Sequence, residues 1–516
     1  MRKFGHLSDT SAIHIWPLPQ SYTLFTDRVN VNVLQFQYES NVKHEILTRA
    51  IERYKAIMFS HTTQRTYSEE EQTDTINKLV IHILDNGEDD SLDMGFDENY
   101  ELIIHDPKHE HSCNEIILRS HKLYGALRGL ETLSQMINYN FYTDEYQTHI
   151  GIIKDFPRYQ HRGVLLDTSR HFHPVLAIKR FLLSLSFVKF NVFHWHIVDE
   201  ESFPYQSNAF PNLWNGSYSS YERYSESDIL EIISYARDLG IRVVPEFDTP
   251  GHAGSWCKGY PQLCIKSQCR KPSPHLLDPS QAFTWDLIDG LFEEASVRFG
   301  DSLFHLGSDE VVHDCYARDS RVQAWVKSEG SIRGTKGVYQ YFVARTSKIA
   351  LKYGKTPIVW NEVYDNFGSE LDKQIIIQLW QGGERQKRQR IVDEGFKVIV
   401  SYGWYLDHVM NKWEDMYLED PRQGLTTASA NNVIGGETCM WSEKIDLSNL
   451  LPTVWPKAGT VAERLWSHKD VRDVNTAKKR YQHLRCLLIR RGIGAAPTIK
   501  QQSRQEPPIQ DSCLVQ

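Results

Sequence analysis

The chain has 516 residues, a net charge of −8 and a pI near 6.3. This length allows two or three ordinary domains, or one large barrel with an accessory domain. The acidic balance gives no reason to expect nucleic acid as a partner. No window approaches the roughly 18 apolar residues that a membrane-spanning helix needs, so we expect no membrane span.

The first 155 residues mix strand and helix patterns. Alternating apolar residues predict strands at about 78–84, 100–105 and 115–118, and apolar residues at helical spacing predict helices at 42–58 and 124–137. These residues contain no cluster of side chains suited to catalysis. We therefore predict a small N-terminal α/β accessory domain over 1–155, with an antiparallel sheet and helices.

From residue 161 onward, strand and helix patterns alternate regularly. The clearest helix places Ile229, Ile232 and Ala236 on one face, with Ser225 or Ser227 able to cap its start and Gly240 at its end. Strands are predicted at 163–167, 191–197, 241–247, 303–307, 357–361, 375–380, 397–402 and 433–440. Eight such strands predict an α/β fold of the (β/α)₈ TIM-barrel type over 156–495, because no Gly-rich phosphate loop supports a doubly wound sheet. Residues 496–516 form a polar C-terminal tail.

Catalytic residues of such a barrel follow the C-terminal ends of its strands. At these positions the chain places carboxylates, imidazoles and indoles, namely Arg170, His194, His196, Asp199, Glu246, Asp248, His252, Asp309, Glu310, Trp360, Glu362, Trp380, Tyr405, Asp407, Trp441 and Glu443. Carboxylates accept hydrogen bonds from hydroxyl groups, and indoles pack against the C–H face of a sugar ring. The set therefore predicts a carbohydrate site.

The adjacent carboxylates of Asp309 and Glu310 are the strongest catalytic candidates. Standard glycosidases place two carboxyl groups on opposite sides of the sugar, about 5 Å apart for retention and about 6.5–9.5 Å for inversion. Neighbouring residues point their side chains apart, so this pair fits that scheme poorly. It fits a substrate-assisted scheme better, in which Glu310 protonates the leaving oxygen and Asp309 orients a 2-acetamido group that attacks the anomeric carbon.

Several long motifs in this order resemble the β-N-acetylhexosaminidases of glycoside hydrolase family 20, most closely the eukaryotic lysosomal and secreted enzymes. The likeness extends from Trp16 to about Gly492. It rests on His161-Arg-Gly-Val-Leu-Leu-Asp-Thr-Ser-Arg-His171, Asn191-Val-Phe-His-Trp-His-Ile-Val-Asp199, Glu246-Phe-Asp-Thr-Pro-Gly-His252, His305-Leu-Gly-Ser-Asp-Glu310 and Trp455-Pro-Lys-Ala-Gly-Thr-Val-Ala-Glu-Arg-Leu-Trp466. The resemblance implies a retaining exo-glycosidase that removes terminal β-linked N-acetylglucosamine or N-acetylgalactosamine through an oxazolinium intermediate.

The resemblance also implies a role for each candidate residue. Glu310 would be the general acid and base, and Asp309 would hold the acetamido group. Asp199 and His252 would form a relay toward Glu310. The remaining residues would bind the sugar: Tyr405 at the acetamido oxygen, Trp360 and Trp380 as pocket walls, Trp441 beneath the ring, and Arg170, Asp407 and Glu443 at the 3-, 4- and 6-hydroxyls. Neither a metal nor an organic cofactor is implied.

Two positions depart from the family pattern. Ser308 stands where the family has a second glycine, and we expect this serine to modulate activity rather than abolish it. His408 after Asp407 resembles the subunit type that takes neutral terminal sugars, which makes sulfated substrates doubtful. The natural glycan, whether of a glycoprotein, a glycolipid or chitin, stays open, as does a homodimer.

The resemblance further implies a lysosomal or secreted protein, although no signal peptide is visible in the sequence. Asn215-Gly-Ser217 is a glycosylation sequon, and the eight cysteines permit disulfides. By resemblance Cys486 pairs with Cys513, and Cys315 pairs with Cys264 or Cys269. Cys439 is then expected to be free.

Two other functions compete with this hypothesis. The His194-Trp-His196 pair could bind zinc in a metal-dependent barrel hydrolase, although such imidazoles are more often satisfied groups of the core, and later strands end in Trp where further His ligands would be needed. The second alternative is a catalytically impaired sugar-binding protein on the same scaffold.

Overall fold

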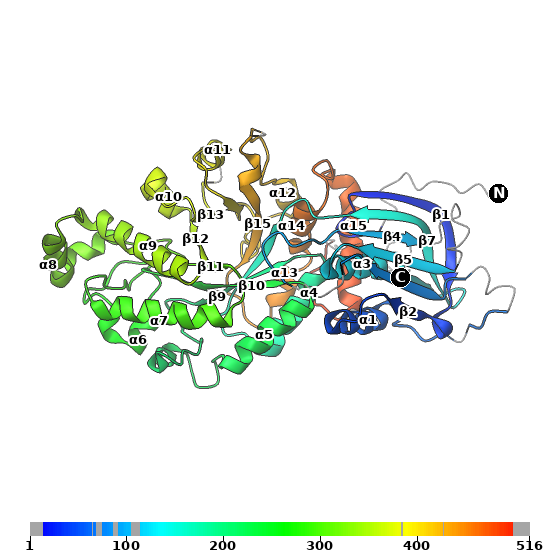
Figure 1. Ribbon diagram of the computed structural model, residues 1–516, viewed down its shortest axis with the longest axis horizontal. Helices are drawn as coiled ribbons and strands as arrows, with labels where there is room; N and C mark the ends of the chain where they lie inside the picture. The colour runs from blue at the N-terminus through cyan, green and yellow to red at the C-terminus, as the bar shows by residue number, and fades with distance from the viewer. Residues whose placement is uncertain are drawn as a thin grey trace, which may run out of the picture.

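The computed structural model describes residues 14–63, 65–68, 75–85, 91–104, 114–382, 385–426 and 428–498. Figure 1 shows a barrel of strands and helices beside a separate N-terminal sheet, with helix α15 (Val474–Arg490) between them. The predicted polar tail lies almost entirely outside the described residues. Within those residues, no helix combines the length and apolar character needed to cross a membrane.

The N-terminal sheet is mixed, whereas the sequence predicted an antiparallel one. Its strand order is β1-β7-β4-β5-β3-β2, with β6 paired to β7. The strands span Ser21–Val31 (β1), Gln37–Ser40 (β2), Lys78–Ile83 (β3), Tyr100–Ile104 (β4), Glu115–Ser120 (β5), Asn138–Asn140 (β6) and Glu145–Asp155 (β7). Strand β3 pairs in parallel with β2 and β5. The reason is helix α1 (Glu45–Met58), which connects β2 to β3 as the crossover that parallel neighbours require.

The larger sheet is a closed parallel barrel of eight strands, which confirms the predicted (β/α)₈ fold. Each strand begins and ends within two residues of its predicted bounds. The strands span His161–Asp167 (β8), Val192–Val198 (β9), Arg242–Phe247 (β10), Leu303–His305 (β11), Thr356–Trp360 (β12), Ile376–Leu379 (β13), Val398–Val400 (β14) and Val433–Met440 (β15).

Helices surround the barrel and cover the N-terminal sheet. Helix α3 (Leu123–Met136) packs on the sheet together with α1. The barrel helices span Val175–Ser186 (α4), Glu226–Asp238 (α5), Gly254–Gly259 (α6), Ala282–Arg298 (α7), Ser320–Glu329 (α8), Gly334–Lys352 (α9), Glu362–Phe367 (α10), Arg385–Asp393 (α11), Trp413–Leu418 (α12), Leu450–Val454 (α13) and Lys457–Trp466 (α14).

The side chains inside the barrel form layers, because residues two apart on a strand point to the same side. On β9, for example, three side chains point into the barrel: those of Val192, His194 and His196, in this order toward the C-terminal end of the strand. The lowest layer is aliphatic and consists of Val192, Val244, Leu303, Ile358, Ile376, Ile399 and Ile434. Polar side chains lie above it, and an upper layer contains Leu165, Trp360, Tyr405 and Cys439 with Trp380 and Trp441 against them. The C-terminal end of the barrel is thus aromatic, and the opposite end is closed by aliphatic side chains.

Buried ion pairs join the N-terminal domain to the bottom of the barrel. Glu98 accepts from Arg128 on α3 and from Arg162 on β8, at 2.8 and 2.5 Å. Arg128 also donates to the carbonyl of Gly240 at 2.7 Å. These contacts lie at the end of the barrel away from the catalytic strand ends, where barrel residues generally serve stability.

Two disulfides lie in one region of the barrel. Cys269 pairs with Cys315, as one of the two sequence alternatives expected, and Cys257 pairs with Cys264, which the sequence did not predict. Cys439 is free and buried, as expected. The expected partner of Cys486, Cys513, lies outside the described residues.

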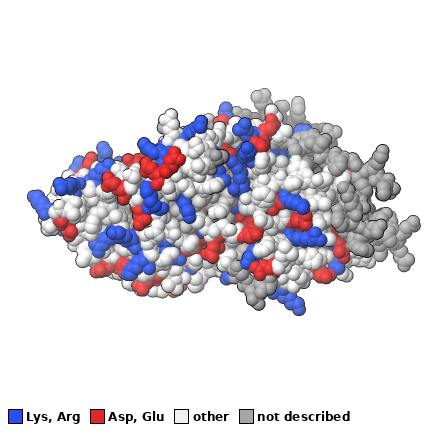
Figure 2. All heavy atoms as spheres, turned by 45° about the horizontal axis from the view of Figure 1, so that its top comes forward, with Lys and Arg blue, Asp and Glu red and all other residues white. Residues whose placement is uncertain are grey.

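The surface carries charges of both signs. Figure 2 shows Lys and Arg interspersed with Asp and Glu over the described part of the face that it draws. This pattern, with the net charge of −8, differs from the single basic stripe typical of nucleic-acid-binding proteins.

Candidate active site

A cavity of about 160 Å³ opens at the C-terminal ends of the barrel strands. It is lined by Arg170, His196, Asp199, Asp248, His252, Asp309, Glu310, Trp380, Tyr405, Asp407, His408, Trp441 and Glu443. Every residue to which the sequence assigned a site role is among these except Trp360. The indole of Trp360 is fully buried beneath the cavity and donates to Glu246 Oε1 at 3.0 Å.

The loop after β11 presents the two adjacent carboxylates. Gly307, Ser308 and Glu310 all have positive φ angles, of 65°, 69° and 50°. A Cβ atom on Gly307 would lie 1.9 Å from Asp248 Oδ1, so only glycine fits there. These dihedrals turn the chain sharply. As a result Asp309 is buried, whereas 35% of the Glu310 side chain is exposed.

Asp309 lies in a crowded group of carboxyls. Its burial, together with repulsion from Asp248, raises the pKa of Asp309. Burial likewise raises the pKa of Asp248 to about 7 and that of Glu362 to about 8. Asp309 Oδ1 is also buried with no hydrogen-bond partner among the described residues. The site therefore holds an unsatisfied acceptor that a donor, or a positive charge, on a ligand would complete.

Glu310 is linked to a buried imidazole and carboxylate. His252 Nε2 lies 3.4 Å from Glu310 Oε2, and His252 Nδ1 lies 3.0 Å from Asp199 Oδ1. Although burial opposes it, the Asp199 carboxylate raises the pKa of His252. Arg170 Nη2 holds the other oxygen of Asp199 at 2.8 Å. A positively charged imidazole therefore faces the carboxyl group of Glu310.

Aromatic rings form the remaining walls. Trp380 donates from Nε1 to Glu362 Oε2 at 2.7 Å, which fixes its indole, and it stacks with Tyr405 at a centroid distance of 5.9 Å. The Arg170 guanidinium lies 5.2 Å from the Trp441 ring centre. These faces suit the apolar side of a sugar ring.

Polar groups at the outer part of the cavity suit sugar hydroxyls. Asp407 Oδ1 is buried without a hydrogen-bond partner among the described residues, and burial raises the pKa of Asp407 to about 6. Glu443 and His408 line the same part of the cavity. Arg170 is tied to Asp167 and Glu201 as well as to Asp199, so ion pairs hold its guanidinium in place at the cavity.

Three groups of side chains in the described part of the chain bring His and carboxyl atoms close enough for a metal ion. They are His194, Glu246 and His305; Asp199, Asp248 and His252; and His252, Asp309 and Glu310. In the barrel interior, however, His196 has a carboxylate oxygen within 2.7 Å of each ring nitrogen. An imidazole donating at both nitrogens has no lone pair for a metal, so His196 fits the expectation of a satisfied core group.

Four residues near the site stand at strand ends in the sequence without a role in the hydrolysis of a sugar. Asp248 and Glu362 crowd Asp309, and Glu246 and His196 lie below Asp199. The signal for Glu246 and Asp248 was the inward-facing alternation Val244, Glu246, Asp248, which puts carboxyls inside a barrel. Sequence spacing alone does not tell which of them contact one another across strands.

Comparisons with known proteins agree with this geometry. Residues 159–469 match the model for the catalytic domain of glycosyl hydrolase family 20, and residues 15–136 match a model described as β-acetyl hexosaminidase like. The chain is 38% identical to β-hexosaminidase 1 of Arabidopsis thaliana, over 98% of this chain and 94% of the relative. It is 36% identical to the β-hexosaminidase subunit beta of Homo sapiens, over 94% and 88%.

Solved structures share the fold. A chitobiase from Flavobacterium johnsoniae superposes with a TM-score of 0.82 at 27% identity, covering 94% of this chain and 73% of that one. An exo-β-N-acetylglucosaminidase from Vibrio harveyi, solved with N-acetylglucosamine, gives a TM-score of 0.79 at 20% identity, over 97% and 80% of the two chains.

Proposed function

The chain belongs to glycosyl hydrolase family 20 and is by that membership a β-N-acetylhexosaminidase, and we propose that it works by substrate-assisted catalysis with retention of configuration. One observation carries the mechanism. A buried Asp309 with an unsatisfied carboxyl oxygen stands next to a half-exposed Glu310 in one aromatic-walled cavity. This pair supplies an acceptor for an acetamido N–H and a proton donor for a leaving group, but no second carboxylate across the sugar.

In the first step, the Glu310 carboxyl gives its proton to the glycosidic oxygen. The substrate's acetamido carbonyl oxygen attacks the anomeric carbon as the bond to the leaving group breaks. This closes an oxazolinium ring and releases the leaving group as an alcohol. The Glu310 carboxylate left behind is stabilised by the His252 imidazolium 3.4 Å away.

In the second step, the Glu310 carboxylate removes a proton from water, and the water oxygen attacks the anomeric carbon. The oxazolinium ring opens, the acetamido group is restored, and Glu310 holds its proton again. Two displacements at the same carbon leave its configuration unchanged.

Asp309 acts on the acetamido group in both steps. The oxazolinium ion is positively charged, and its N–H can donate to the unsatisfied Oδ1 of Asp309. Burial and Asp248 disfavour a negative charge on Asp309 in the empty site. A developing positive charge relieves that cost, so the interaction is stronger in the transition state than in the ground state.

The substrate is a glycan with a terminal non-reducing N-acetylglucosamine or N-acetylgalactosamine. A cavity of about 160 Å³ suits a single terminal ring, which means exo action. Asp407 and Glu443 beside the ring favour neutral sugars over sulfated ones. Glycoprotein, glycolipid and chitin oligosaccharide substrates all present such an end.

The localisation and the oligomeric state of the enzyme are proposed from its disulfides and from the names of its relatives. The two disulfides support a lysosomal or secreted protein, because such bonds persist in oxidising compartments. Two relatives are named as subunits, alpha and beta, of β-hexosaminidases, and by analogy we propose that this chain also assembles, as a homodimer.

The test is hydrolysis of a chromogenic aryl N-acetyl-β-glucosaminide at mildly acidic pH, beside the matching 2-hydroxy β-glucoside. We expect cleavage of the acetamido sugar only, unchanged by chelator. Glu310→Gln should lower kcat by at least about 100-fold, because removing a positioned proton donor costs that much. Asp309→Asn should cost a similar factor.

Glu370→Gln, an exposed carboxylate outside the cavity, is the matched control and should keep full activity. Turnover lost on adding chelator would favour the metal-dependent hydrolase. Binding of N-acetylglucosamine without turnover by the wild-type protein would favour the sugar-binding alternative.

A further inference from the structure

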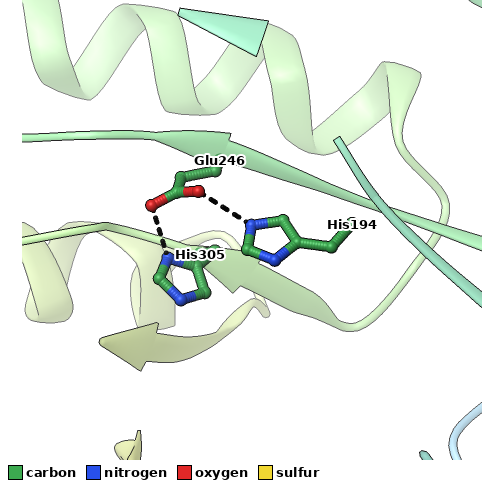
Figure 3. Close-up of side chains that lie close together, drawn as sticks. All are labelled: His194, Glu246 and His305. Carbon is green, nitrogen blue, oxygen red and sulfur yellow. Dashed lines mark ion pairs between the residues drawn. The ribbon is translucent and has the colours of Figure 1, made fainter. Parts of the chain in front are cut away.

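The middle of the barrel contains six titratable side chains that the proposed mechanism does not use. They are His161, His194, His196, Glu246, His305 and Glu437, and each is at most 1% exposed. Figure 3 shows Glu246 facing the rings of both His194 and His305. Ionisable groups are costly to bury without partners, so the arrangement of these six needs a physical reason.

Together with the active-site groups, these residues form a continuous row that alternates carboxylate and imidazole. From the cavity downward its members are Glu310, His252, Asp199, His196, Glu246, His194 and Glu437. Below Asp199, the contacts are His196 Nε2 to Asp199 at 2.7 Å, His196 Nδ1 to Glu246 at 2.6 Å, His194 Nε2 to Glu246 at 2.9 Å and His194 Nδ1 to Glu437 at 2.6 Å. We call this set the barrel row.

Every imidazole of the barrel row lies between two carboxylates. Burial alone would lower the pKa of His194, but Glu437 and Glu246 outweigh it and raise that pKa to about 9. Glu246 and Asp199 raise the pKa of His196 in the same way. Positive and negative charges therefore alternate along the row, each compensating its neighbours.

The barrel row is closed at its lower end. The aliphatic layer of Val192, Val244, Leu303, Ile358, Ile376, Ile399 and Ile434 lies beneath it, and its last carboxylate contacts His161 at 3.0 Å. Burial lowers the pKa of His161, so the row ends on a neutral ring. The row thus leads to the cavity and not through the barrel to solvent.

We propose that Glu246 and His196 are positioning residues that act on Glu310 through Asp199 and His252, and that they set the pH at which hydrolysis fails on the alkaline side. This inference rests on the proposed role of Glu310 as the general acid. Glu246 keeps His196 protonated. The His196 imidazolium and Arg170 together hold the Asp199 carboxylate in place. Asp199 in turn keeps His252 positively charged beside Glu310.

Other charged groups face this pair from the neighbouring strands. Glu246 also receives Trp360 Nε1 from β12 and lies 3.0 Å from His305 Nδ1 on β11. Burial lowers the pKa of His305, so this ring adds no charge. The remaining groups near the row are Asp248 at the end of β10, Asp309 after β11, Arg170 after β8, and Cys439 and Glu437 on β15.

Glu246→Gln gives the proposal a signed test. Without the Glu246 charge, His196 keeps only Asp199 as a carboxylate partner, so its pKa falls and we expect the ring to give up its proton at lower pH. His196 lines the cavity and Glu246 does not, so His196 is nearer to Glu310. The positive charge lost from His196 therefore affects Glu310 more than the negative charge lost from Glu246. The potential at Glu310 becomes less positive, and Glu310 keeps its proton to higher pH. We expect the alkaline limb of kcat/KM to move upward by about 0.3 to 1 pH unit.

Two variants serve as references. Glu437→Gln removes the far end of the row and should shift the limb in the same direction by less. Asp301→Asn removes a buried carboxylate that pairs with Arg242 at 2.6 Å outside the row, and should lower stability without shifting the limb. A downward shift in Glu246→Gln, or one no larger than in Asp301→Asn, would overturn the proposal.

A measurement on the unaltered protein covers the case in which Glu246→Gln does not fold. With ¹⁵N-labelled histidine at pH 7.5, His194, His196 and His252 should each show both ring nitrogens protonated, whereas an ordinary histidine is largely neutral there. Fewer than three imidazolium rings, or one tightly bound metal ion per chain by elemental analysis, would overturn it. Full turnover in Glu310→Gln would instead refute the proposed function, independently of the row.

Discussion

At the scale of single residues, Ser308 lies in the loop after β11, at the position where the family resemblance leads us to expect a second glycine. Its φ of 69° lies in the left-handed region, which costs a non-glycine residue about 1 kcal/mol or more. Hydrogen bonds hold it there: its N–H donates to Asp248 Oδ1 at 2.8 Å, its carbonyl accepts from Tyr339, and its hydroxyl lies 2.7 Å from the Thr249 carbonyl and 3.4 Å from the Leu306 carbonyl. The hydroxyl contact is the one that glycine could not make.

Ser308→Gly should therefore change the free energy of unfolding by less than about 1 kcal/mol, because relief of backbone strain offsets the lost hydrogen bond. Ser308→Ala keeps the strain and loses the bond, so it should be less stable than Ser308→Gly by about 1 kcal/mol. Denaturant titration of both variants measures the order. Alanine matching or exceeding glycine in stability would show that the backbone strain at this position is unimportant.

At the scale of elements, the barrel places its catalytic groups through repeated strand and helix units whose ends are well defined. Helix α5 is an example. Ser225 Oγ accepts from the Asp228 N–H at 3.2 Å, and Asp228 Oδ2 accepts from the Ser225 N–H at 2.8 Å, which is a capping box. The helix buries Ile229, Ile232 and Ala236 against the barrel and is followed by Gly240 at a φ of 67°. Of the two serines that the sequence offered as the cap, Ser225 has this role.

Ser225→Ala should lower the free energy of unfolding by about 1 kcal/mol, the usual cost of losing an N-cap. Ser227→Ala is the matched control, because Ser227 contacts only the Ser225 hydroxyl on the exposed side and should cost less. Thermal unfolding of the two variants compares them directly. Hydrolysis by both should remain unchanged, since neither residue reaches the cavity. An equal loss of stability in the two variants would argue against the capping box.

At the scale of the whole molecule, the buried ionisable groups couple stability to pH. Imidazoles with raised pKa values, such as His194 at about 9, stabilise fully below their ordinary value of 6.5 and lose this contribution as the pH rises through the folded value. Carboxyls with lowered pKa values, such as Glu437, stabilise above their ordinary value of 4.5 and lose this contribution as the pH falls. Carboxyls with raised values, such as Glu362 at about 8, destabilise the fold as the pH rises and they ionise.

The first two effects together favour the window between about 4.5 and 6.5, and the carboxyls with raised pKa values add a further loss of stability as the pH rises from 4.5 toward 8. The melting temperature should accordingly be higher at pH 5.5 than at pH 8.5, by about 5 °C or more. Scanning calorimetry across this range measures it. A melting temperature that is constant, or higher at pH 8.5, would mean that the buried groups do not carry the charges assigned to them.

Most of the barrel was predictable because its strands are short, buried and regularly spaced. Hydrophobic periodicity alone predicted all eight strands. Because strands and helices alternate along the chain, a parallel sheet was expected, and eight such units predicted a barrel. The N-terminal sheet was harder to predict, because an alternating strand such as β3 fits a parallel neighbour as well as an antiparallel one. Only the position of α1 as a crossover decided the direction of β2 and β3.

The sequence by itself determined which chemical groups stand at the strand ends, since a residue after a barrel strand must lie at the catalytic face. It thereby determined the composition of the site, including Asp309 and Glu310. The tertiary structure alone decided which of these groups touch. His252 meets Glu310, Asp248 crowds Asp309, and Glu246 joins His194 to His196 only because the barrel closes. Charges interact over a few ångströms through space, and distance along the chain does not report that separation.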